Sequence, residues 1–141
     1  MNNNYNKSRE KFFNFLLKEP KTKSKAKAYL SHTSLSDEES EKLIHEAEEM
    51  GLIDDFTYAL LFVDGHLMWG NAKIAFTLRQ KGISNDAVLY ALDKSEDEIS
   101  RASELATQWK KSGLDERKII TRLLSRGFKN SSAHEAVKSW N

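Results

Sequence analysis

The sequence contains no cysteine, one proline and only three valines among its 141 residues. The absence of cysteine excludes disulfides and thiolate metal sites, and it gives no reason to expect an oxidising compartment. Because proline breaks helices and β-branched residues favour strands, their scarcity predicts an all-helical fold. The first residues show no apolar segment typical of a signal peptide, and no run approaches the roughly 18 apolar residues of a membrane span, so we expect a cytoplasmic protein.

The charges are balanced overall but segregated along the chain. The sequence has 22 Lys and Arg against 21 Asp and Glu, which gives a net charge of +1. Residues 7–27 carry eight basic and two acidic side chains, residues 37–55 carry nine acidic and one basic, and residues 109–129 carry seven basic and two acidic. Two positive segments therefore flank a negative one, and the whole molecule has no strong field to steer it to nucleic acid.

Glycines followed directly by an apolar residue predict where four helices end. Glycine tolerates the left-handed backbone that closes a helix, and the next residue packs back on the last turn; the four are Gly51, Gly82, Gly113 and Gly127. Ser36 with Glu39, and Ser95 with Glu98, fit the capping box. Further N-cap candidates are Asp54, Asn71, Ser84 and Asp115. Together with the helical spacing of apolar residues, these signals predict nine helices, over residues 8–18, 23–32, 37–50, 55–69, 72–81, 85–93, 96–112, 116–126 and 130–140.

The helical pattern repeats about every 45 residues. A shift of 45 places Gly82 on Gly127, and a shift of 48 carries Leu78 to Leu30, with Ser34 in the glycine position. The sequence therefore predicts an all-α fold of three tandem three-helix repeats, residues 1–50, 51–93 and 94–141. Such repeats contact mainly their neighbours, so we expect an elongated, curved array of helices linked at right angles.

A combination of short motifs in the middle repeat resembles a known family. The segment 50–59 reads Met-Gly-Leu-Ile-Asp-Asp-Phe-Thr-Tyr-Ala, and Leu78 is followed by Arg-Gln-Lys-Gly-Ile. This combination resembles the RecX family of bacterial regulators of the RecA recombinase, over about residues 8–140. The resemblance implies an all-helical repeat fold, no catalysis, and inhibition of RecA by binding along or capping its filament on single-stranded DNA. The chain departs from the family at residues 66–71, where members usually carry basic residues, and at Thr77, where they usually carry an acidic one.

The second helix of each repeat carries the candidate partner-binding surface. Lys118, Arg122 and Arg126 are spaced at i, i+4 and i+8 and so share one helix face. The repeat shifts relate Lys118 to Lys73 and Lys25 by position. We predict contacts with an acidic RecA surface or with phosphate from Lys21, Lys23, Lys25, Lys27, Lys73, Arg79, Lys81, Lys118, Arg122, Arg126, Lys129 and Trp69. The alternative interpretation is a solvated helix face that binds no partner.

Other side chains have structural explanations. Adjacent carboxylates at Asp54 and Asp55 fit helix capping and the helix dipole. The histidines lack metal-ligand spacing, and without cysteine, a nucleophile turn or a phosphate-binding glycine loop we expect no catalysis, no metal and no cofactor. Trp109 and Trp140 continue apolar stripes into the core, whereas Trp69 either forms an exposed contact patch or plugs the junction of repeats one and two.

The leading functional hypothesis is a non-enzymatic, monomeric modulator that lies in the helical groove of the RecA filament, with weak binding to single-stranded DNA and no membrane association. The first alternative is a DNA-binding regulator that uses residues 72–81 and 85–93 as a helix-turn-helix pair. That pair is poor in basic residues where a recognition helix needs them. The second alternative is a small helical bundle around residues 126–128 that binds a peptide or ubiquitin, which would not require tandem repeats.

Overall fold

The regular structure of the chain is entirely helical in the computed structural model, which describes residues 3–138. The helices are α1 (Asn3–Lys18), α2 (Lys23–Ser31), α3 (Asp37–Glu49), α4 (Asp55–Asp64), α5 (Asn71–Gln80), α6 (Asn85–Lys94), α7 (Glu98–Lys111), α8 (Glu116–Ser125) and α9 (Asn130–Lys138). The predicted all-helical fold is confirmed. Within residues 3–138, no helix combines the length and apolar character that crossing a membrane requires.

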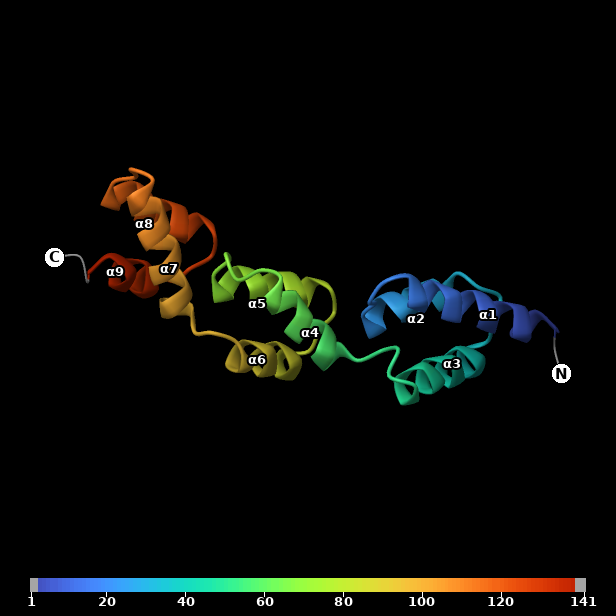
Figure 1. Cartoon of the computed structure of the whole chain (residues 1–141). Helices are drawn as coiled ribbons and strands as arrows, with labels where there is room; N and C mark the ends of the chain where they lie inside the picture. Colours follow the sequence, from blue (N-terminus) through green and yellow to red (C-terminus); the bar gives the residue numbers. More distant parts are fainter. Residues whose placement is uncertain (1–2, 139–141) are drawn as a thin grey trace.

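The nine helices of the described chain follow one another in three groups along an elongated body whose ends lie far apart (Figure 1). Buried apolar side chains form one cluster in each group, which we call the first unit (α1–α3), second unit (α4–α6) and third unit (α7–α9). The largest fully buried side chains are Phe12, Leu30 and Leu43 in the first unit, Val63, Ile74, Leu78 and Val88 in the second, and Ile119 and Leu123 in the third. These clusters fit the predicted division of the chain, and the three tandem repeats over residues 1–50, 51–93 and 94–141 stay a prediction.

Glycines close four helices as the sequence predicts. Gly51, Gly82, Gly113 and Gly127 all have positive φ, between 75° and 99°. In each case the amide of the following residue donates to a carbonyl five positions earlier, as Ile83 does to Leu78 at 3.1 Å. This is the Schellman arrangement, which satisfies carbonyls that would otherwise lack a partner at the helix end.

Most predicted N-caps are confirmed and two are wrong. The Ser36–Glu39 capping box forms, and Asp54, Ser84 and Asp115 each accept an amide hydrogen bond as N-caps. Helix α7 instead starts after Asp97, whose carboxylate accepts from the Ser100 amide at 2.8 Å. Hydrogen bonds from Ser100 lower the pKa of the Asp97 carboxyl. Ser95 closes α6 by donating its hydroxyl to the Leu92 carbonyl, and the N-cap of α5 is Gly70, one residue before Asn71.

Two helix boundaries differ from prediction by about five residues. Helix α1 begins at Asn3, because Tyr5 is buried and extends the apolar face of the helix towards its N-terminus. Helix α4 ends at Asp64, and Gly65 is its C-cap with φ of −83°. Beyond that point the ring of His66 stacks on Phe62 with centroids 3.9 Å apart, and the chain turns towards the third unit. The predicted last helix extends to residue 140, and Trp140 lies outside the described residues.

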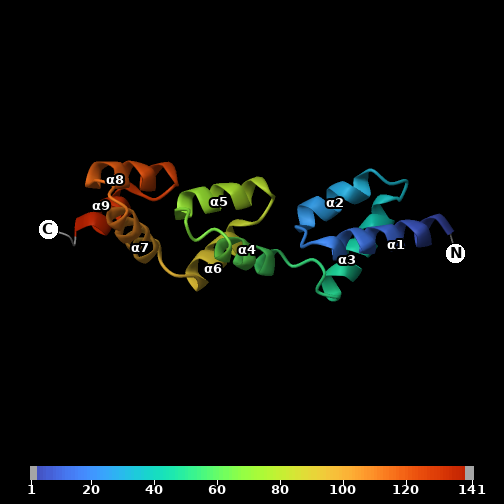
Figure 2. The same ribbon diagram turned by 45° about the horizontal axis from the view of Figure 1, so that its top comes forward.

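The second helices of the three units form a head-to-tail row, which we call the second-helix row. Helices α2, α5 and α8 lie along one edge of the molecule (Figure 2). The Gly70 amide at the start of α5 donates to the Arg126 carbonyl at the end of α8, at 2.8 Å. Gly82 at the end of α5 lies so close to α2 that a β-carbon added there would be 2.7 Å from the Ser24 β-carbon. Each helix therefore points its C-terminus at the N-terminus of the previous unit's second helix, an alignment that the helix dipoles favour.

Candidate partner-binding surface

The second-helix row concentrates positive charge from all three units. Helices α2, α5 and α8 with the C-caps Lys81 and Arg126 contain ten basic residues and one acidic residue. Helix α3, which lies on the opposite edge together with α6 (Figure 1), contains seven acidic residues and one lysine. A nearly neutral protein is therefore strongly polarised across its width, and its positive edge is able to attract an anionic partner.

The third unit holds the most developed part of this surface. The guanidinium groups of Arg122 and Arg126 lie 5.0 Å and 5.1 Å from the ring centroid of Trp109, which is half-buried against the core of the unit. Lys118 is exposed one turn earlier on α8. Cation–π contact with the indole limits the motion of both arginine side chains while leaving their planar donor groups available for carboxylate or phosphate.

The second unit repeats this arrangement with fewer charges. The Lys73 ammonium lies 4.2 Å from the centroid of Trp69, and Lys81 is exposed at the end of α5. Between them stands Thr77, which occupies the position that Arg122 has in the third unit and bonds its own helix through the Lys73 carbonyl. Arg79 donates instead to Asn85 at the start of α6, at 2.7 Å.

Trp69 supports this surface and is not a separate exposed patch. Its ring is half-buried against the core of the second unit and lies 4.4 Å from the ring of His66, centroid to centroid. Its carbonyl accepts a hydrogen bond from Arg101 of the third unit. The hypothesis that Trp69 plugs the junction of the first and second units is therefore wrong, because it lies at the next junction along the chain.

The basic residues of the second-helix row are less available to a partner in the first unit than in the other two units. Lys25 is exposed at the position equivalent to Lys73, but Lys27 faces α3, where it lines a hollow with Asp37 and Glu41. The Lys23 ammonium lies 3.2 Å from the carboxylate of Glu48. These two lysines are directed towards the acidic helix of their own unit, which weakens the net field at this end.

Lys21 is a structural lysine, contrary to its prediction as a contact residue. Its residue surface is only 5% exposed, and its ammonium donates to the Glu19 carbonyl at 3.0 Å. The ring centroid of Phe15 lies 4.6 Å from the same nitrogen. A buried cation satisfied in this way is not accessible to a partner. Lys129, by contrast, is exposed just before α9.

A buried polar network joins the second and third units, and the sequence did not reveal it. Glu98 and Arg101, in the first turn of α7, are 5% and 2% exposed. The Glu98 carboxylate accepts from the Asn71 amide at 2.8 Å and from the Ser132 hydroxyl at 2.6 Å. Arg101 donates to the carbonyls of Leu67 and Trp69 and to the Asn71 side chain. Burial lowers the pKa of the Arg101 guanidinium, and the charges of Glu98, Glu96 and Asp97 oppose that shift.

One signal for this network was present in the sequence. By helical spacing, Glu98 and Arg101 share the buried face of α7 with Ala102 and Leu105. Charged residues on such a face are almost never fully buried without partners. The second carboxylate of the Asp54–Asp55 pair has a similar role at the previous junction, because Asp55 accepts the Lys23 amide at 2.9 Å.

Within the described residues, no group of three or more His, Cys, Asp or Glu side chains is arranged to hold a metal ion.

Known proteins resemble the chain in both sequence and fold. The regulatory protein RecX of Lactobacillus delbrueckii subsp. bulgaricus is 30% identical over 135 residues, which cover 88% of this chain and 50% of the relative. The regulatory protein RecX of Thermobifida fusca is 28% identical over 145 residues, covering 95% of this chain and 78% of the relative. The family that the chain resembles in sequence is the RecX family.

The solved structures extend this likeness to the fold. The crystal structure of RecX from Lactobacillus salivarius superposes with a TM-score of 0.83 over 96% of each chain, at 20% sequence identity. A second crystal structure of a regulatory protein RecX gives a TM-score of 0.74 over 96% of this chain and 72% of the other. No protein-family model matches the chain. The chain spans about half the length of the Lactobacillus delbrueckii relatives that it matches.

Proposed function

We propose that this protein is a cytoplasmic, non-enzymatic regulator of the RecX family that binds the RecA filament on single-stranded DNA and inhibits its ATPase and recombinase activities. In this role it modulates recombination, DNA repair and the SOS response. The observation that carries the proposal is the similarity to proteins named regulatory protein RecX, three of which match 88–95% of this chain at 28–30% identity. The polarised surface on an elongated repeat scaffold suits a ligand that is itself a repeating polymer.

The mechanism rests on many weak contacts along the filament. In our proposal the second-helix row faces acidic RecA surface or DNA phosphate, with the Trp109-supported arginines at one end and Lys25 at the other. A monomer that lies in the filament groove contacts successive RecA protomers. Each further contact is intramolecular once the first has formed, so affinity rises through effective concentration. Bridging the protomers hinders filament growth and strand exchange.

Binding to naked single-stranded DNA is expected to be weak. The residues of the row that are exposed and unengaged by acidic groups allow about four to six phosphate contacts, each adding about 0.7 to the salt slope on single strands. Binding of that size is modest and falls steeply with salt. A partner that offers protein surface as well as phosphate therefore fits this edge better than DNA alone.

The test is an assay of ATP hydrolysis by RecA on single-stranded DNA. Adding the purified protein is expected to lower the steady-state rate in proportion to its concentration. Unchanged hydrolysis at several-fold molar excess over RecA contradicts the proposal. Sequence-specific binding of duplex DNA in a mobility-shift experiment would favour the helix-turn-helix alternative instead.

A further inference from the structure

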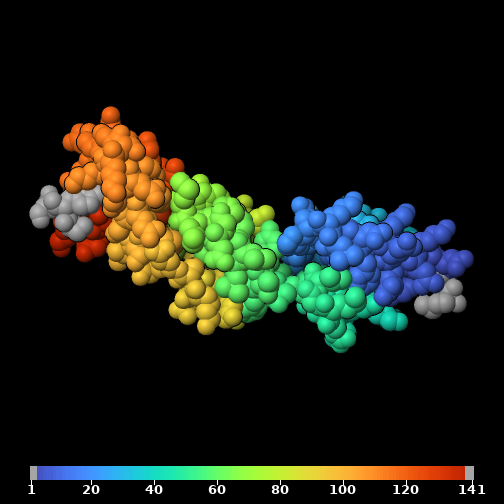
Figure 3. All heavy atoms as spheres, in the orientation of Figure 1, coloured from blue at the N-terminus to red at the C-terminus, as the bar shows by residue number. Residues whose placement is uncertain are grey.

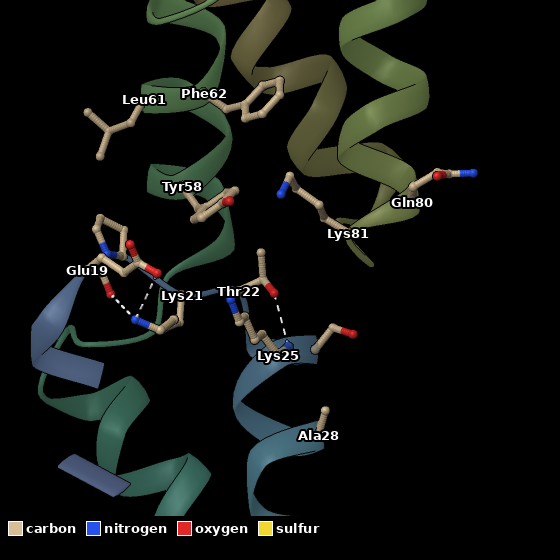
Figure 4. A pocket seen from close by; sticks show the side chains of 12 residues that line it. Glu19, Lys21, Thr22, Lys25, Ala28, Tyr58, Leu61, Phe62, Gln80 and Lys81 are labelled. Atoms are coloured by element: carbon tan, nitrogen blue, oxygen red, sulfur yellow. Dashed lines mark hydrogen bonds and ion pairs between the residues drawn. The ribbon is translucent and has the colours of Figure 1, made fainter. Parts of the chain in front are cut away.

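An open cleft lies between the first and second units, directly beside the second-helix row. It has a volume of about 560 Å³ and is bounded by α2, α4, the end of α5 and the segment after α1. Figure 4 shows its walls: Lys25 comes from α2, Lys81 from the end of α5, and Tyr58 and Phe62 from α4. Figure 3 shows the waist of the molecule at this junction, where the first unit meets the second.

The floor of the cleft is apolar and accessible. Leu61 on α4 is 56% exposed and lines the cleft together with the half-buried Tyr58 and Phe62. A second hollow of about 400 Å³ shares Pro20, Tyr58 and Leu61 with the cleft and continues to Leu17, which is 66% exposed. Two large aliphatic side chains are therefore left in water in two adjoining hollows, and covering them with a partner's apolar groups is favourable.

The rim of the cleft is positive. Lys25 and Lys81 are both exposed, and among the described residues neither ammonium has an ion-pair or hydrogen-bond partner. The acidic residue of the lining, Glu19, has its carboxylate 3.6 Å from the buried Lys21 ammonium. The cleft therefore presents two unpaired cations above an apolar floor, and the complementary ligand carries carboxylates on either side of an apolar side chain.

We propose that this cleft binds an acidic peptide segment with a leucine-like or phenylalanine-like anchor, supplied by the partner protein. The anchor covers Leu61 and Tyr58 while carboxylates pair with Lys25 and Lys81. The most exposed large apolar side chain of the cleft is Leu61, which gives no stacking platform for a base, whereas the half-buried ring of Phe62 is already stacked on His66. Peptide is therefore favoured over single-stranded nucleic acid. Only the identity of the protein that supplies the segment rests on the proposed function. Because the cleft is formed by two units, the bound segment also fixes their relative position.

The probe is a fluorescein-labelled peptide of sequence Glu-Asp-Leu-Phe-Glu-Asp, titrated with the full chain and followed by fluorescence anisotropy. Saturable binding is expected, and the double variant Lys25→Glu/Lys81→Glu is expected to raise its Kd at least about tenfold. The control Lys7→Glu/Lys111→Glu makes the same change in net charge at exposed sites away from the cleft and is expected to change Kd less than about twofold. Leu61→Asp is expected to weaken binding, whereas Leu89→Asp, on an equally exposed leucine of α6, is not.

The outcomes separate this proposal from the proposed function. Absence of saturable peptide binding, or equal weakening by the control pair, overturns the cleft assignment. Competition of the peptide by an oligothymidylate that binds more tightly and is equally sensitive to Lys25→Glu/Lys81→Glu reassigns the cleft to nucleic acid and also overturns it. If the peptide binds as expected while wild-type protein leaves RecA hydrolysis unchanged, the cleft stands and the proposed function fails. If RecA is inhibited but the peptide does not bind, the proposed function stands and the cleft assignment fails.

Discussion

The two junctions between the three units share the same backbone contacts but differ in how completely they are packed. At both, the first amide of a second helix donates to a carboxylate in the first turn of the next unit, Lys23 to Asp55 and Asn71 to Glu98. At both, the glycine that ends the next unit's second helix packs against that helix start. The second junction adds the buried side chains of Arg101 and Ser132, whereas the first has no such buried polar network among the described residues and leaves an open cleft.

This difference predicts that the two junctions are not equally rigid. A buried polar network with all its groups satisfied specifies one arrangement of its neighbours, whereas a junction with fewer buried polar contacts beside an open cleft tolerates displacement. The second and third units are therefore expected to behave as one body that carries the strongest part of the basic surface. The first unit is expected to adjust its position relative to them, which suits a cleft that accepts a ligand at the looser junction.

The largest effect is expected from Gly70→Ala, at the second junction. An added β-carbon would lie 2.1 Å from the Gly127 backbone, so α5 and α8 must separate and the Gly70–Arg126 hydrogen bond is lost. We expect a loss of about 3 kcal/mol in the free energy of unfolding, measured by urea denaturation with circular dichroism. Gly113→Ala is the control, because its β-carbon would meet nothing within 4 Å and only its positive φ is strained, at about 1 kcal/mol. Equal losses would contradict the close packing of this junction.

The next effect compares equivalent carboxylates at the two junctions. Glu98→Gln places an amide donor where two donors already converge and removes a charge near buried Arg101, so we expect a loss of about 2 kcal/mol. Asp55→Asn keeps an oxygen for the Lys23 amide at a half-buried site, and we expect about 0.5 kcal/mol or less. Urea denaturation of both variants gives the comparison. A larger loss for Asp55→Asn would reverse our assignment of the two junctions.

A smaller difference is expected in the wild-type protein by hydrogen exchange. The Lys23 amide, bonded across the looser junction, should exchange at least about ten times faster than the Gly70 and Asn71 amides. The Ala26 amide, bonded within α2 to the Thr22 carbonyl at 3.0 Å, separates opening of the junction from fraying of the helix. Equal protection of Lys23 and Asn71 would show that both junctions open together.

The smallest effect concerns an exposed ion pair inside the first unit. The hydrogen bond from Arg9 lowers the pKa of the Glu46 carboxyl below its ordinary value. Its contribution is therefore present above the unfolded pKa, near 4.5, and disappears as the pH falls through the lower folded value. Arg9→Gln is expected to cost about 0.5 kcal/mol at pH 7, since both side chains are partly exposed, with a smaller difference at acid pH. A difference that grows on acidification would contradict the ion pair.

Local signals in the sequence predicted the helices and their ends, because glycine conformation and N-cap chemistry involve only neighbouring residues. Ser36 and Asp54 illustrate this, as do all four glycines with positive φ. The junctions were not predictable in the same way. Glu98 fits a capping box with Ser95, but its carboxylate bonds to Asn71 and Ser132, about 30 residues away on either side. Burial of Lys21 depends likewise on how the segment after α1 folds over Phe15.

The sequence predicted which basic residues share a helix face, but it did not predict which of them are held in place or exposed. The i, i+4 spacing identified Lys118, Arg122 and Arg126, but the support of the two arginines by Trp109 required the packing of α7 on α8. The positive charge of the second-helix row is weaker in the first unit, where Lys23 and Lys27 are directed towards the acidic helix α3. The repeat therefore predicts that a position carries a basic residue, whereas the contacts of that side chain depend on the helix packed beside it.

The central claim is that the positive edge of the molecule engages RecA, and inhibition of RecA-catalysed ATP hydrolysis by a charge-reversed variant tests it most directly. We predict that Lys118→Glu/Arg122→Glu/Arg126→Glu raises the concentration needed for half-maximal inhibition at least about tenfold, with its far-ultraviolet helical signal unchanged. Lys7→Glu/Lys11→Glu/Lys138→Glu, with the same change in net charge on other helices, is predicted to inhibit like the wild type. Undiminished inhibition by the α8 variant would contradict the account.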